Sequence, residues 1–360
     1  MNLFVLSELP SIENHVGWIA NYDLEEILLN TCEATFIYPE ANNKIRFFKK
    51  LRHRLFKSWF KVKELPTLGE GPNVLLLVGM TYSSLLMLPA LEPLLDKFDV
   101  CLAYLFDIYE PRSLPKYSIS SLDYLFLPVS EIADEVSKIF PVKTVFLPHA
   151  FNALKYAANH PHRCIDIIGY GRGNPDLDRC LQEHFNKAQN PRFYFHSTFA
   201  RPELTSFKEH RTLLSKLLAK SQISLCFEPS TVERFKGYSP ILTRWFEGWA
   251  AGCTIVGKKP FGQGVAELMD WPNSTIELPD ASLEWIPFFE DLLANKEMLL
   301  ANTQQNYREC LLRHDWRYRI KVMLETAGLP IPEKLELEIG QLQQKAELGI
   351  PSQEYQQIHI

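Results

Sequence analysis

Three basic side chains lie close together in the sequence, beside a segment with the signals of a helix. Arg234 and Lys236 belong to the loop after the apolar run Ile223 to Phe227, and Arg244 follows within the helical segment. A helix N-terminus has free N–H groups and a partial positive charge, so neighbouring cations favour an anionic ligand. Gly237 lets the loop backbone approach that ligand closely. The pattern predicts a diphosphate site.

Local sequence signals also mark where this helix begins and where it ends. Ser239 is a suitable N-cap, Pro240 suits a first turn, and Gly252 favours a left-handed end. Its apolar face, at helical spacing, consists of Ile241, Leu242, Trp245, Phe246 and Trp249. The opposite face carries Thr243, Arg244, Glu247 and Ala251. Because the helix follows a strand, its start should face the region beyond that strand's carboxyl end, although Arg244 and Glu247 also fit an ordinary pair on a solvated face.

A glycine-rich turn, IDIIGYGRGNPDLDR, follows another apolar run. Gly171 would let a ligand approach the backbone, and Arg172 either faces a phosphate or remains an exposed loop residue. Asn174 stands where the dinucleotide fingerprint needs glycine or alanine, and no Walker lysine follows. Asp176 and Asp178 have a metal-binding spacing, but they open a helix, where acids are expected anyway. These observations predict no metal site and support neither NAD nor ATP binding.

Candidates for a general base follow the apolar runs of the first half. His15 comes soon after the first run, and Asp107 and Glu110 follow a later one. Loops at strand carboxyl ends face ligand sites in α/β sheets, so His15 and Asp107 are the catalytic candidates. The carboxylates also suit turn or helix capping. His149 ends the last run of this half, where a lone histidine often only binds a backbone carbonyl.

Apolar runs alternate with helical patterns along most of the chain, which predicts parallel sheets covered on both faces. In the first half, strands are expected at 3–6, 34–38, 74–78, 100–106, 124–128 and 144–147, and helices at 24–30, 83–97 and 131–140. In the second half, further strands are expected at 192–196, 223–227, 254–256 and 274–278, and further helices at 176–188, 209–221, 281–295, 296–314 and 316–327. We therefore predict two Rossmann-like domains, 1–155 and 156–329, and a polar extension, 330–360, that is loosely ordered or docked on a partner.

Composition excludes several classes of protein. The 360 residues carry a formal net charge of −5, which gives no general footprint for nucleic acid. Seven scattered cysteines, an N-terminus without signal-peptide features and the lack of a long apolar run predict a cytoplasmic protein. The basic, aromatic-rich segment 43–62 suits either peripheral contact with an inner membrane surface or an ordinary amphipathic surface helix.

Four segments together resemble a known family. FLPHAFN, DIIGYGRGNPDLDR, RWFEGWAAGCTIVGKKP and NYRECLLRHDWRYRIKVML, in this order, are similar to group 1 glycosyltransferases of the GT-B fold. Within that group they look most like the spore-maturation-protein-like branch, which carries R-x-F-E-x-x-A-x-G. The resemblance covers roughly residues 143–327. It implies two Rossmann-like domains whose parallel sheets face a central cleft, with the acceptor on the first domain and a nucleotide-sugar donor on the second.

The resemblance also implies roles for individual residues. Glu247 would accept the ribose hydroxyls of the donor, a nucleotide-diphosphate sugar of UDP or GDP type. The remaining donor-binding residues would be Gly171, Arg172, Arg234, Lys236, Tyr238 and Arg244. No bound cofactor or metal is implied. Many retaining relatives have a glutamate where this chain has Ser239, which leaves the stereochemical outcome open.

The predicted function is therefore the metal-independent transfer of a hexose-type sugar to an acceptor hydroxyl, as in cell-envelope or polysaccharide biosynthesis. The acceptor would be a sugar, a lipid-linked compound or a protein. Two alternatives stay open: a nucleotide-sugar epimerase or hydrolase on the same fold, and a non-catalytic nucleotide-sugar-binding protein, for which Ser239 would mark lost chemistry.

Overall fold

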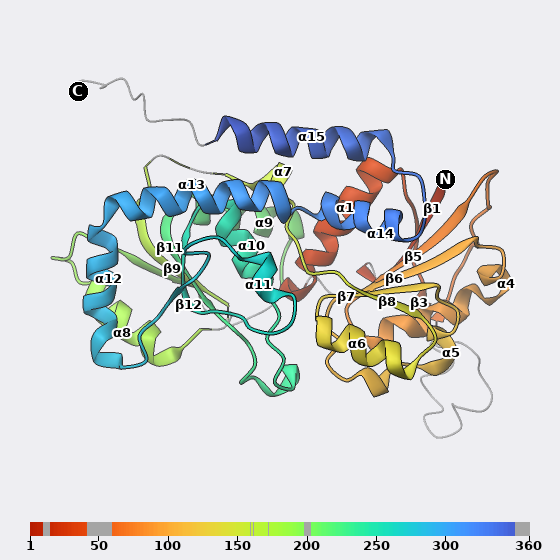
Figure 1. The fold of residues 1–360 in the computed structure, drawn as a ribbon, viewed down its shortest axis with the longest axis horizontal. Helices are drawn as coiled ribbons and strands as arrows, with labels where there is room; N and C mark the ends of the chain where they lie inside the picture. Colours follow the sequence, from red (N-terminus) through yellow and green to blue (C-terminus); the bar gives the residue numbers. More distant parts are fainter. Residues whose placement is uncertain are drawn as a thin grey trace. The chain divides into compact units, whose positions relative to one another are not determined.

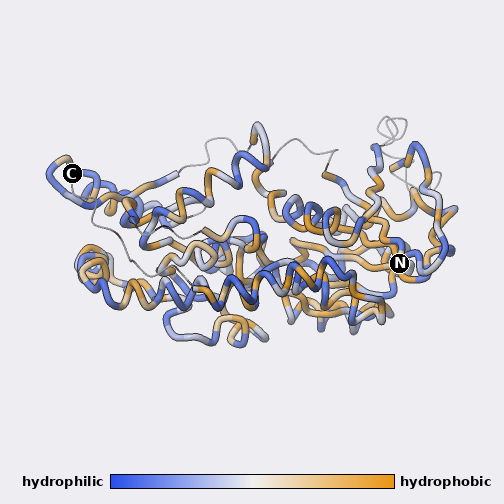
Figure 2. The backbone as a smooth tube through the Cα atoms, turned by 90° about the horizontal axis from the view of Figure 1, so that it is seen from above, coloured by the Kyte–Doolittle hydropathy of each residue, from blue (hydrophilic) through white to orange (hydrophobic). Residues whose placement is uncertain are grey.

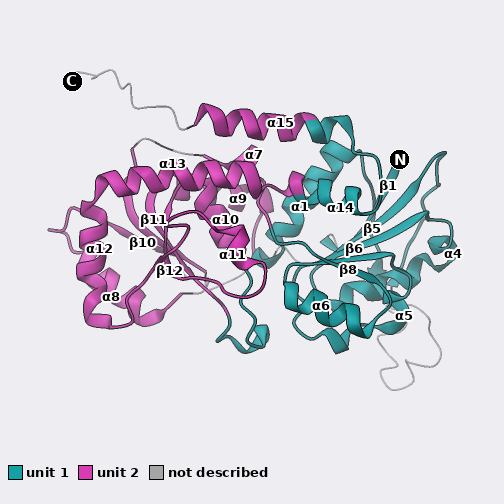
Figure 3. Ribbon diagram, viewed as in Figure 1, with its two compact units in different colours: residues 1–149, 230–240, 319–336 teal, residues 150–229, 241–318, 337–360 magenta. Residues whose placement is uncertain are grey.

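The computed structural model describes residues 1–9, 15–41, 60–158, 160, 162–171, 173–197 and 203–349. Their contacts define two units, shown in Figure 3: unit 1 comprises 1–149, 230–240 and 319–336, and unit 2 comprises 150–229, 241–318 and 337–360. Each unit is an α/β structure built on a parallel sheet. The sequence prediction divided the chain after residues 155 and 329, whereas the contacts also assign 230–240 and 319–336 to unit 1.

Unit 1 has a six-stranded parallel sheet in the order β2-β1-β5-β6-β7-β8. Its strands are β1 (Asn2–Ser7), β2 (Thr35–Ile37), β5 (Asn73–Gly79), β6 (Val100–Leu105), β7 (Tyr124–Leu127) and β8 (Lys143–Phe146). All six predicted strands of this half are confirmed. Every residue of β5 is buried, because a central parallel strand is covered on both faces, and Figure 2 shows hydrophobic residues along these strands.

Helices lie on both sides of this sheet, with α1 above it and α5 and α6 below it in Figure 1. The helices are η2 (Val16–Trp18), α1 (Ile19–Cys32), η3 (Tyr82–Leu91), α4 (Glu92–Leu95), η4 (Pro111–Ser113), α5 (Lys116–Ile119) and α6 (Ser130–Ile139). The helix expected at 83–97 forms as the 3-10 helix η3 followed by the short α4. Pro89 lies inside η3, where it cannot donate the backbone hydrogen bond that an α-helix requires.

The basic segment 43–62 lies almost entirely outside the described residues. Of its described end, Phe60 and Lys61 form β4 (Phe60–Lys61), which pairs antiparallel with β3 (Glu40–Ala41). In the part of the chain that the structure describes, no helix combines the length and the apolar character needed to cross a membrane.

Unit 2 has a five-stranded parallel sheet in the order β10-β9-β11-β12-β13. Its strands are β9 (Ile165–Tyr170), β10 (Tyr194–Ser197), β11 (Ser221–Phe227), β12 (Thr254–Lys258) and β13 (Ile276–Glu277). Ile167 packs in the core with α8 and α12, and its neighbour Ile168 packs in the core with α10 and α13. Successive side chains of a strand point to opposite faces, so the sheet is buried on both.

The helices of unit 2 cover these two faces. They are α7 (Ala153–Tyr156), α8 (Pro175–Phe185), α9 (Phe207–Ala219), α10 (Thr243–Ala250), α11 (Val265–Leu268), η6 (Ser282–Glu284), α12 (Trp285–Ala294) and α13 (Lys296–Arg313). The short η5 (Glu233–Phe235) belongs to unit 1, and α14 (Trp316–Thr326) and α15 (Glu333–Leu348) are divided between the two units.

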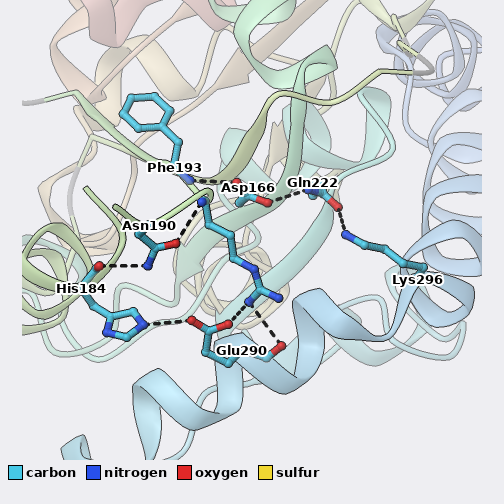
Figure 4. A network of polar contacts seen from close by, with 8 residues as sticks. Asp166, His184, Asn190, Phe193, Gln222, Glu290 and Lys296 are labelled. Atoms are coloured by element: carbon cyan, nitrogen blue, oxygen red, sulfur yellow. Dashed lines mark hydrogen bonds and ion pairs between the residues drawn. The ribbon is translucent and has the colours of Figure 1, made fainter. Parts of the chain in front are cut away.

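A polar network holds the amino edge of the unit 2 sheet, as Figure 4 shows. Asp166 of β9 accepts hydrogen bonds from the Phe193 amide (2.8 Å) and the Gln222 side chain (2.9 Å). On α12, Glu290 accepts a hydrogen bond from His184 (2.9 Å) and pairs with Arg192. These side chains satisfy one another's hydrogen-bonding groups at the amino edge of the sheet.

Helix α10 differs from the prediction at its start. It begins at Thr243 without a side-chain cap, whereas Ser239 and Pro240 precede it and pack with unit 1. Its predicted end is confirmed, because Gly252 has a left-handed φ of 65°. A Cβ atom at Gly248 would overlap the Ile255 side chain, so the glycine lets the helix lie close against β12.

The extension was predicted to be either loosely ordered or docked on a partner, and the first of these alternatives is wrong for α15. One face of this helix is buried through Leu335, Ile339, Leu342 and Ala346, at helical spacing. Lys345 donates hydrogen bonds to the carbonyls of Leu154 (3.4 Å) and Ala157 (2.9 Å). Apolar burial therefore outweighs the helix-weakening effect of Gly340, while residues 350–360 lie outside the described part of the chain.

Candidate functional site

The carboxyl edge of the unit 2 sheet brings together two of the predicted donor-binding residues. Arg244, in the first turn of α10, donates a hydrogen bond to the carbonyl of Tyr170, the last residue of β9 (3.1 Å). Gly171 follows directly with a φ of 70°, a conformation that favours glycine. The N-terminal end of α10 thus lies beside the glycine-rich turn. Arg172 lies outside the described residues.

Glu247 is buried, so the alternative of an ordinary pair with Arg244 on a solvated face is wrong. Its side chain is 4% exposed and forms an ion pair with Arg211 of α9, which is 1% exposed. The hydroxyl of Tyr170 donates to the other carboxylate oxygen (2.9 Å). Burial, followed by the charge of Glu247, raises the pKa of Tyr170 well above its ordinary value, so the phenol stays protonated and donates this bond. Both carboxylate oxygens therefore have protein partners.

Arg211 was missed by sequence reasoning, although a signal existed. Together with Ser215 and Leu218 it forms a buried stripe on α9 at the spacing i, i+4, i+7. An arginine on such a stripe must have a partner, because an unpaired buried charge is very costly. Its guanidinium carbon also lies 5.0 Å from the centre of the Phe151 ring. The pattern indicates that Arg211 forms a buried ion pair, but it does not identify the acidic residue.

Arg234 and Lys236 are assigned to unit 1 and form ion pairs within it. Both belong to segment 230–240, which packs with unit 1. Arg234 pairs with Asp107 (3.3 Å), and Lys236 pairs with Glu110 (3.2 Å). Of the three cations predicted to gather around the donor diphosphate, Arg244 belongs to unit 2, and Arg234 and Lys236 belong to unit 1. The other two cations compensate carboxylates that follow β6.

Aromatic packing explains why segment 230–240 belongs to unit 1. Phe235 is fully buried, and its ring centre lies 4.8 Å from that of Tyr109. Tyr238, another predicted donor-binding residue, lies in the same segment. Burial and the nearby carboxylates of Glu135 and Glu131, on α6 of unit 1, raise its pKa. Tyr238 is therefore also placed on unit 1.

A pocket of about 400 Å³ opens where this segment meets the carboxyl edge of the unit 1 sheet. Its lining comes from three stretches of unit 1: the start of η3, the loop after β6, and segment 230–240. The lining includes Tyr82, Asp107, Tyr109, Glu110, Arg234 and Lys236. The structure thus brings Asp107, predicted as a base, together with two residues that were predicted to bind the donor. The Tyr109 hydroxyl also donates to Asp107 (3.3 Å).

A second acid, Glu8, was missed by sequence reasoning. It follows β1 directly, and its carboxylate accepts hydrogen bonds from the Met80 amide (3.1 Å) and the Ser84 hydroxyl. The Met80 carbonyl in turn accepts from the Asp107 amide (2.7 Å), so one backbone segment connects both acids. Burial raises the pKa of Glu8, and burial raises that of nearby Glu25 to about 8. The sequence signal that could have identified Glu8 is a carboxylate directly after an expected strand of the first half.

His15, the other predicted base, is exposed and caps a turn. Its Nδ1 accepts a hydrogen bond from the Gly17 amide (3.0 Å) at the start of η2. This bond fixes Nδ1 as the acceptor nitrogen, so the ring proton is on Nε2 when the imidazole is neutral. The structure does not bring His15 into the lining of the pocket that contains Asp107.

His149 is a buried structural residue. It hydrogen-bonds the Tyr104 hydroxyl (3.1 Å) and stacks on Phe106 at 5.4 Å between ring centres. Burial, followed by the charge of Arg319, lowers its pKa to about 3. The imidazole is therefore neutral in the folded chain at physiological pH, which excludes a role as a readily protonated acid.

This burial predicts a loss of stability in mild acid. The unfolded chain takes up a proton below about pH 6.5 and the folded chain only near pH 3, so the free energy of unfolding falls as the pH drops through that window. Between pH 7 and pH 5 the expected contribution is about 2 kcal/mol. Urea unfolding of wild type and His149→Gln at both pH values measures it. The variant should lose less stability on acidification than the wild-type chain. Parallel losses in both would contradict the assignment.

The acids of the D-x-D sequence have structural partners. Asp178 accepts a hydrogen bond from the Tyr194 hydroxyl (2.6 Å) and pairs with His196 (3.1 Å), while Asp176 pairs with Arg179. Asn174 caps α8 by accepting from the amides of residues 176 and 177. Within the described ranges, no three His, Cys, Asp or Glu side chains gather closely enough to hold a metal ion.

With both units described, the fold class is clear: two α/β units on parallel sheets, as in the GT-B fold. No family model matches the sequence, and no curated protein does. Among solved structures, Anabaena HepE in complex with UDP and glucose aligns over 91% of this chain and 99% of its own, with 10% identity and a TM-score of 0.54. HepE in complex with UDP-glucose aligns over 91% and 99%, with 9% identity and a TM-score of 0.51. The likeness extends over both units and shows a shared fold.

Proposed function

We propose that this chain is a glycosyltransferase that transfers a sugar from a nucleotide-diphosphate sugar to an acceptor hydroxyl. The observation that carries the proposal is the likeness in fold, over almost the whole chain, to HepE structures that hold UDP, glucose or UDP-glucose. The carboxyl edge of unit 2 adds chemical support, because Arg244, Gly171 and the start of α10 meet there. A uridine nucleotide is accordingly the proposed donor.

The proposed chemistry follows from these residues. An acceptor oxygen forms a bond to the anomeric carbon, the bond from that carbon to the diphosphate breaks, and the acceptor proton passes to a carboxylate. Negative charge then grows on the diphosphate, where Arg244 and the positive end of α10 stabilise it more in the transition state than in the ground state. In this proposal unit 2 binds the donor, and unit 1 binds the acceptor with Asp107 as base.

Glu247 is proposed to act by positioning other groups. The family resemblance implies that it accepts the ribose hydroxyls, yet both of its oxygens already have protein partners. It holds the Tyr170 side chain, and the Tyr170 carbonyl holds Arg244. This chain of contacts supports Glu247 as the residue that orients Arg244 for the diphosphate.

The remaining proposals concern family and partners. The spore-maturation-protein-like branch rests on the sequence resemblance alone. A lipid-linked or protein acceptor, metal independence, and peripheral membrane contact through residues 43–62 stay predictions.

The experiment that tests the function is a donor screen. UDP-, GDP-, ADP- and dTDP-sugars are added to the full chain, and thermal unfolding is followed. A UDP-sugar should raise the melting temperature most, since a ligand at 100 times its Kd stabilises the folded state by about 2.7 kcal/mol. Loss of a charge-assisted contact in Arg244→Ala should weaken donor binding about 10- to 100-fold. Arg308→Ala, which removes an exposed arginine of unit 2, should leave binding unchanged.

Product analysis then separates the alternatives. A glycosyltransferase releases the nucleotide faster when an acceptor is added. An epimerase or hydrolase converts the donor at the same rate without one. A non-catalytic binding protein shows the thermal shift but releases no nucleotide with any acceptor. Either of the last two results, or a shift with none of the donors, would overturn the proposed transfer reaction.

A further inference from the structure

We propose that the 400 Å³ pocket of unit 1 binds an uncharged, hydroxyl-rich acceptor, namely a sugar, and discriminates against phosphorylated acceptors. This inference rests on the proposed glycosyl transfer and specifies the class of acceptor.

The position and size of the pocket suit a small acceptor. It lies where β5 and β6 end, at the carboxyl edge where parallel sheets bind ligands. Its volume is near the lower end of the range of about 300 to 1,000 Å³ found for small-molecule sites. The pocket is therefore large enough for one or two sugar rings, whereas most of a bulky partner would have to remain outside it.

The wall of the pocket is preformed. Segment 230–240 is anchored by Phe235, which is fully buried against Tyr109, and the Arg234 guanidinium carbon lies 4.5 Å from the centre of the Phe235 ring. Two ion pairs, Arg234 with Asp107 and Lys236 with Glu110, join the segment to the loop after β6. A site that is already ordered loses little conformational entropy when a ligand binds.

The charges of the lining argue against an anionic ligand. Three carboxylates, Asp107, Glu110 and Glu233, stand against two cations, Arg234 and Lys236, which leaves a formal charge of 2 − 3 = −1. Each cation is already paired with a carboxylate, so a phosphate would have to displace that partner and then lie close to it. A hydroxyl both donates and accepts hydrogen bonds, so it can bind at the rim of an ion pair without breaking it.

An aromatic side chain completes the site. Tyr82 lines the pocket, and its side chain is 48% exposed, whereas Tyr109, which also lines the pocket, is buried. A sugar ring has polar edges and apolar C–H faces, and a flat aromatic ring can pack against such a face while its hydroxyl remains hydrated. Tyr82 is thus the proposed platform for the sugar ring, in the pocket that Asp107 also lines.

The test uses ligand-observed saturation-transfer NMR on the full chain with UDP present. Glucose, galactose and N-acetylglucosamine are compared with glucose 6-phosphate and glycerol phosphate. At least one neutral sugar should bind, and the phosphates should bind at least tenfold more weakly. Tyr82→Ala should weaken sugar binding about tenfold. Tyr117→Ala removes another exposed tyrosine of unit 1 that does not line the pocket, and it should leave binding unchanged.

A charge variant tests the discrimination itself. Glu233→Lys reverses one lining charge, so it should bring the affinity for glucose 6-phosphate closer to that for glucose. Equal or tighter binding of phosphates by the wild-type chain, or sugar binding that is indifferent to Tyr82→Ala, would overturn the inference. The donor screen keeps the two proposals separate. Turnover of a UDP-sugar without Tyr82-dependent sugar binding defeats only the pocket assignment, whereas Tyr82-dependent binding without any donor binding defeats only glycosyl transfer.

Discussion

Glu247→Ala should lower the free energy of unfolding by about 3 to 5 kcal/mol, because it leaves the Arg211 guanidinium buried without its ion partner. The Tyr170 hydroxyl, fully enclosed in unit 2, loses its acceptor as well. Urea unfolding at neutral pH measures the loss. An effect this large would distinguish a buried structural pair from a pair on a solvated helix face, which was one of the two interpretations of the sequence.

Two further variants serve as controls. Glu290→Ala removes a carboxylate that is 37% exposed and paired with His184 and Arg192, so its cost should be about 1 kcal/mol or less. The double variant Arg211→Leu with Glu247→Gln removes both charges and keeps an acceptor for Tyr170. It should recover much of the stability lost by Glu247→Ala, because uncharged replacements of a buried pair are often tolerated. A single variant as stable as wild type would show that the pair is not needed for folding.

Asp107→Asn should lower kcat for sugar transfer about 10²- to 10⁴-fold, the range expected when a general base is removed. Asparagine keeps the size of the side chain but cannot take up the acceptor proton. Stability should change little, because the lost ion pair with Arg234 is largely exposed on the arginine side. Initial rates with saturating donor and acceptor measure the effect, with donor binding checked by thermal shift.

Asp134→Asn is the matched control for this variant, since Asp134 is an exposed acid on α6 that does not line the pocket. It should retain the wild-type rate. A profile of kcat against pH adds a second readout, because loss of the base should abolish the fall in rate at the acidic end. If Asp107→Asn transferred sugar at the wild-type rate, the base would have to be sought elsewhere. Glu8 would be the next residue to replace, since the Met80 backbone connects it to Asp107.

The regular elements of both units were largely predictable. A strand such as β5, buried on both faces, requires a continuous apolar run, and a helix such as α9 requires apolar residues at a spacing of three and four. Such patterns are local. The apolar face of α10 and the glycine that ends it were also correctly predicted, because both depend on neighbouring residues.

The candidate sites were predictable only in part. The sequence predicted that the helix of Arg244 starts near the carboxyl end of the preceding strand, and the structure places Arg244 beside the glycine-rich turn at that edge. The partner of Glu247 could not be predicted, since Arg211 lies on another helix and only packing brings the two together. The same holds for α15, whose buried face depends on contacts with residues far back in the chain, such as Leu154.

By itself, the sequence determined the α/β class, the order of strands and helices, and the residues that end β9 and α10, because hydrophobic periodicity and turn chemistry act over a few residues. Only the tertiary structure decided that segment 230–240 joins unit 1 and that its two cations pair with Asp107 and Glu110. The physical reason is that the identity of a charged residue does not specify which oppositely charged group it will pair with. Arg234 suits a phosphate as well as a carboxylate, and the burial of Phe235 against Tyr109 determines which of them it meets.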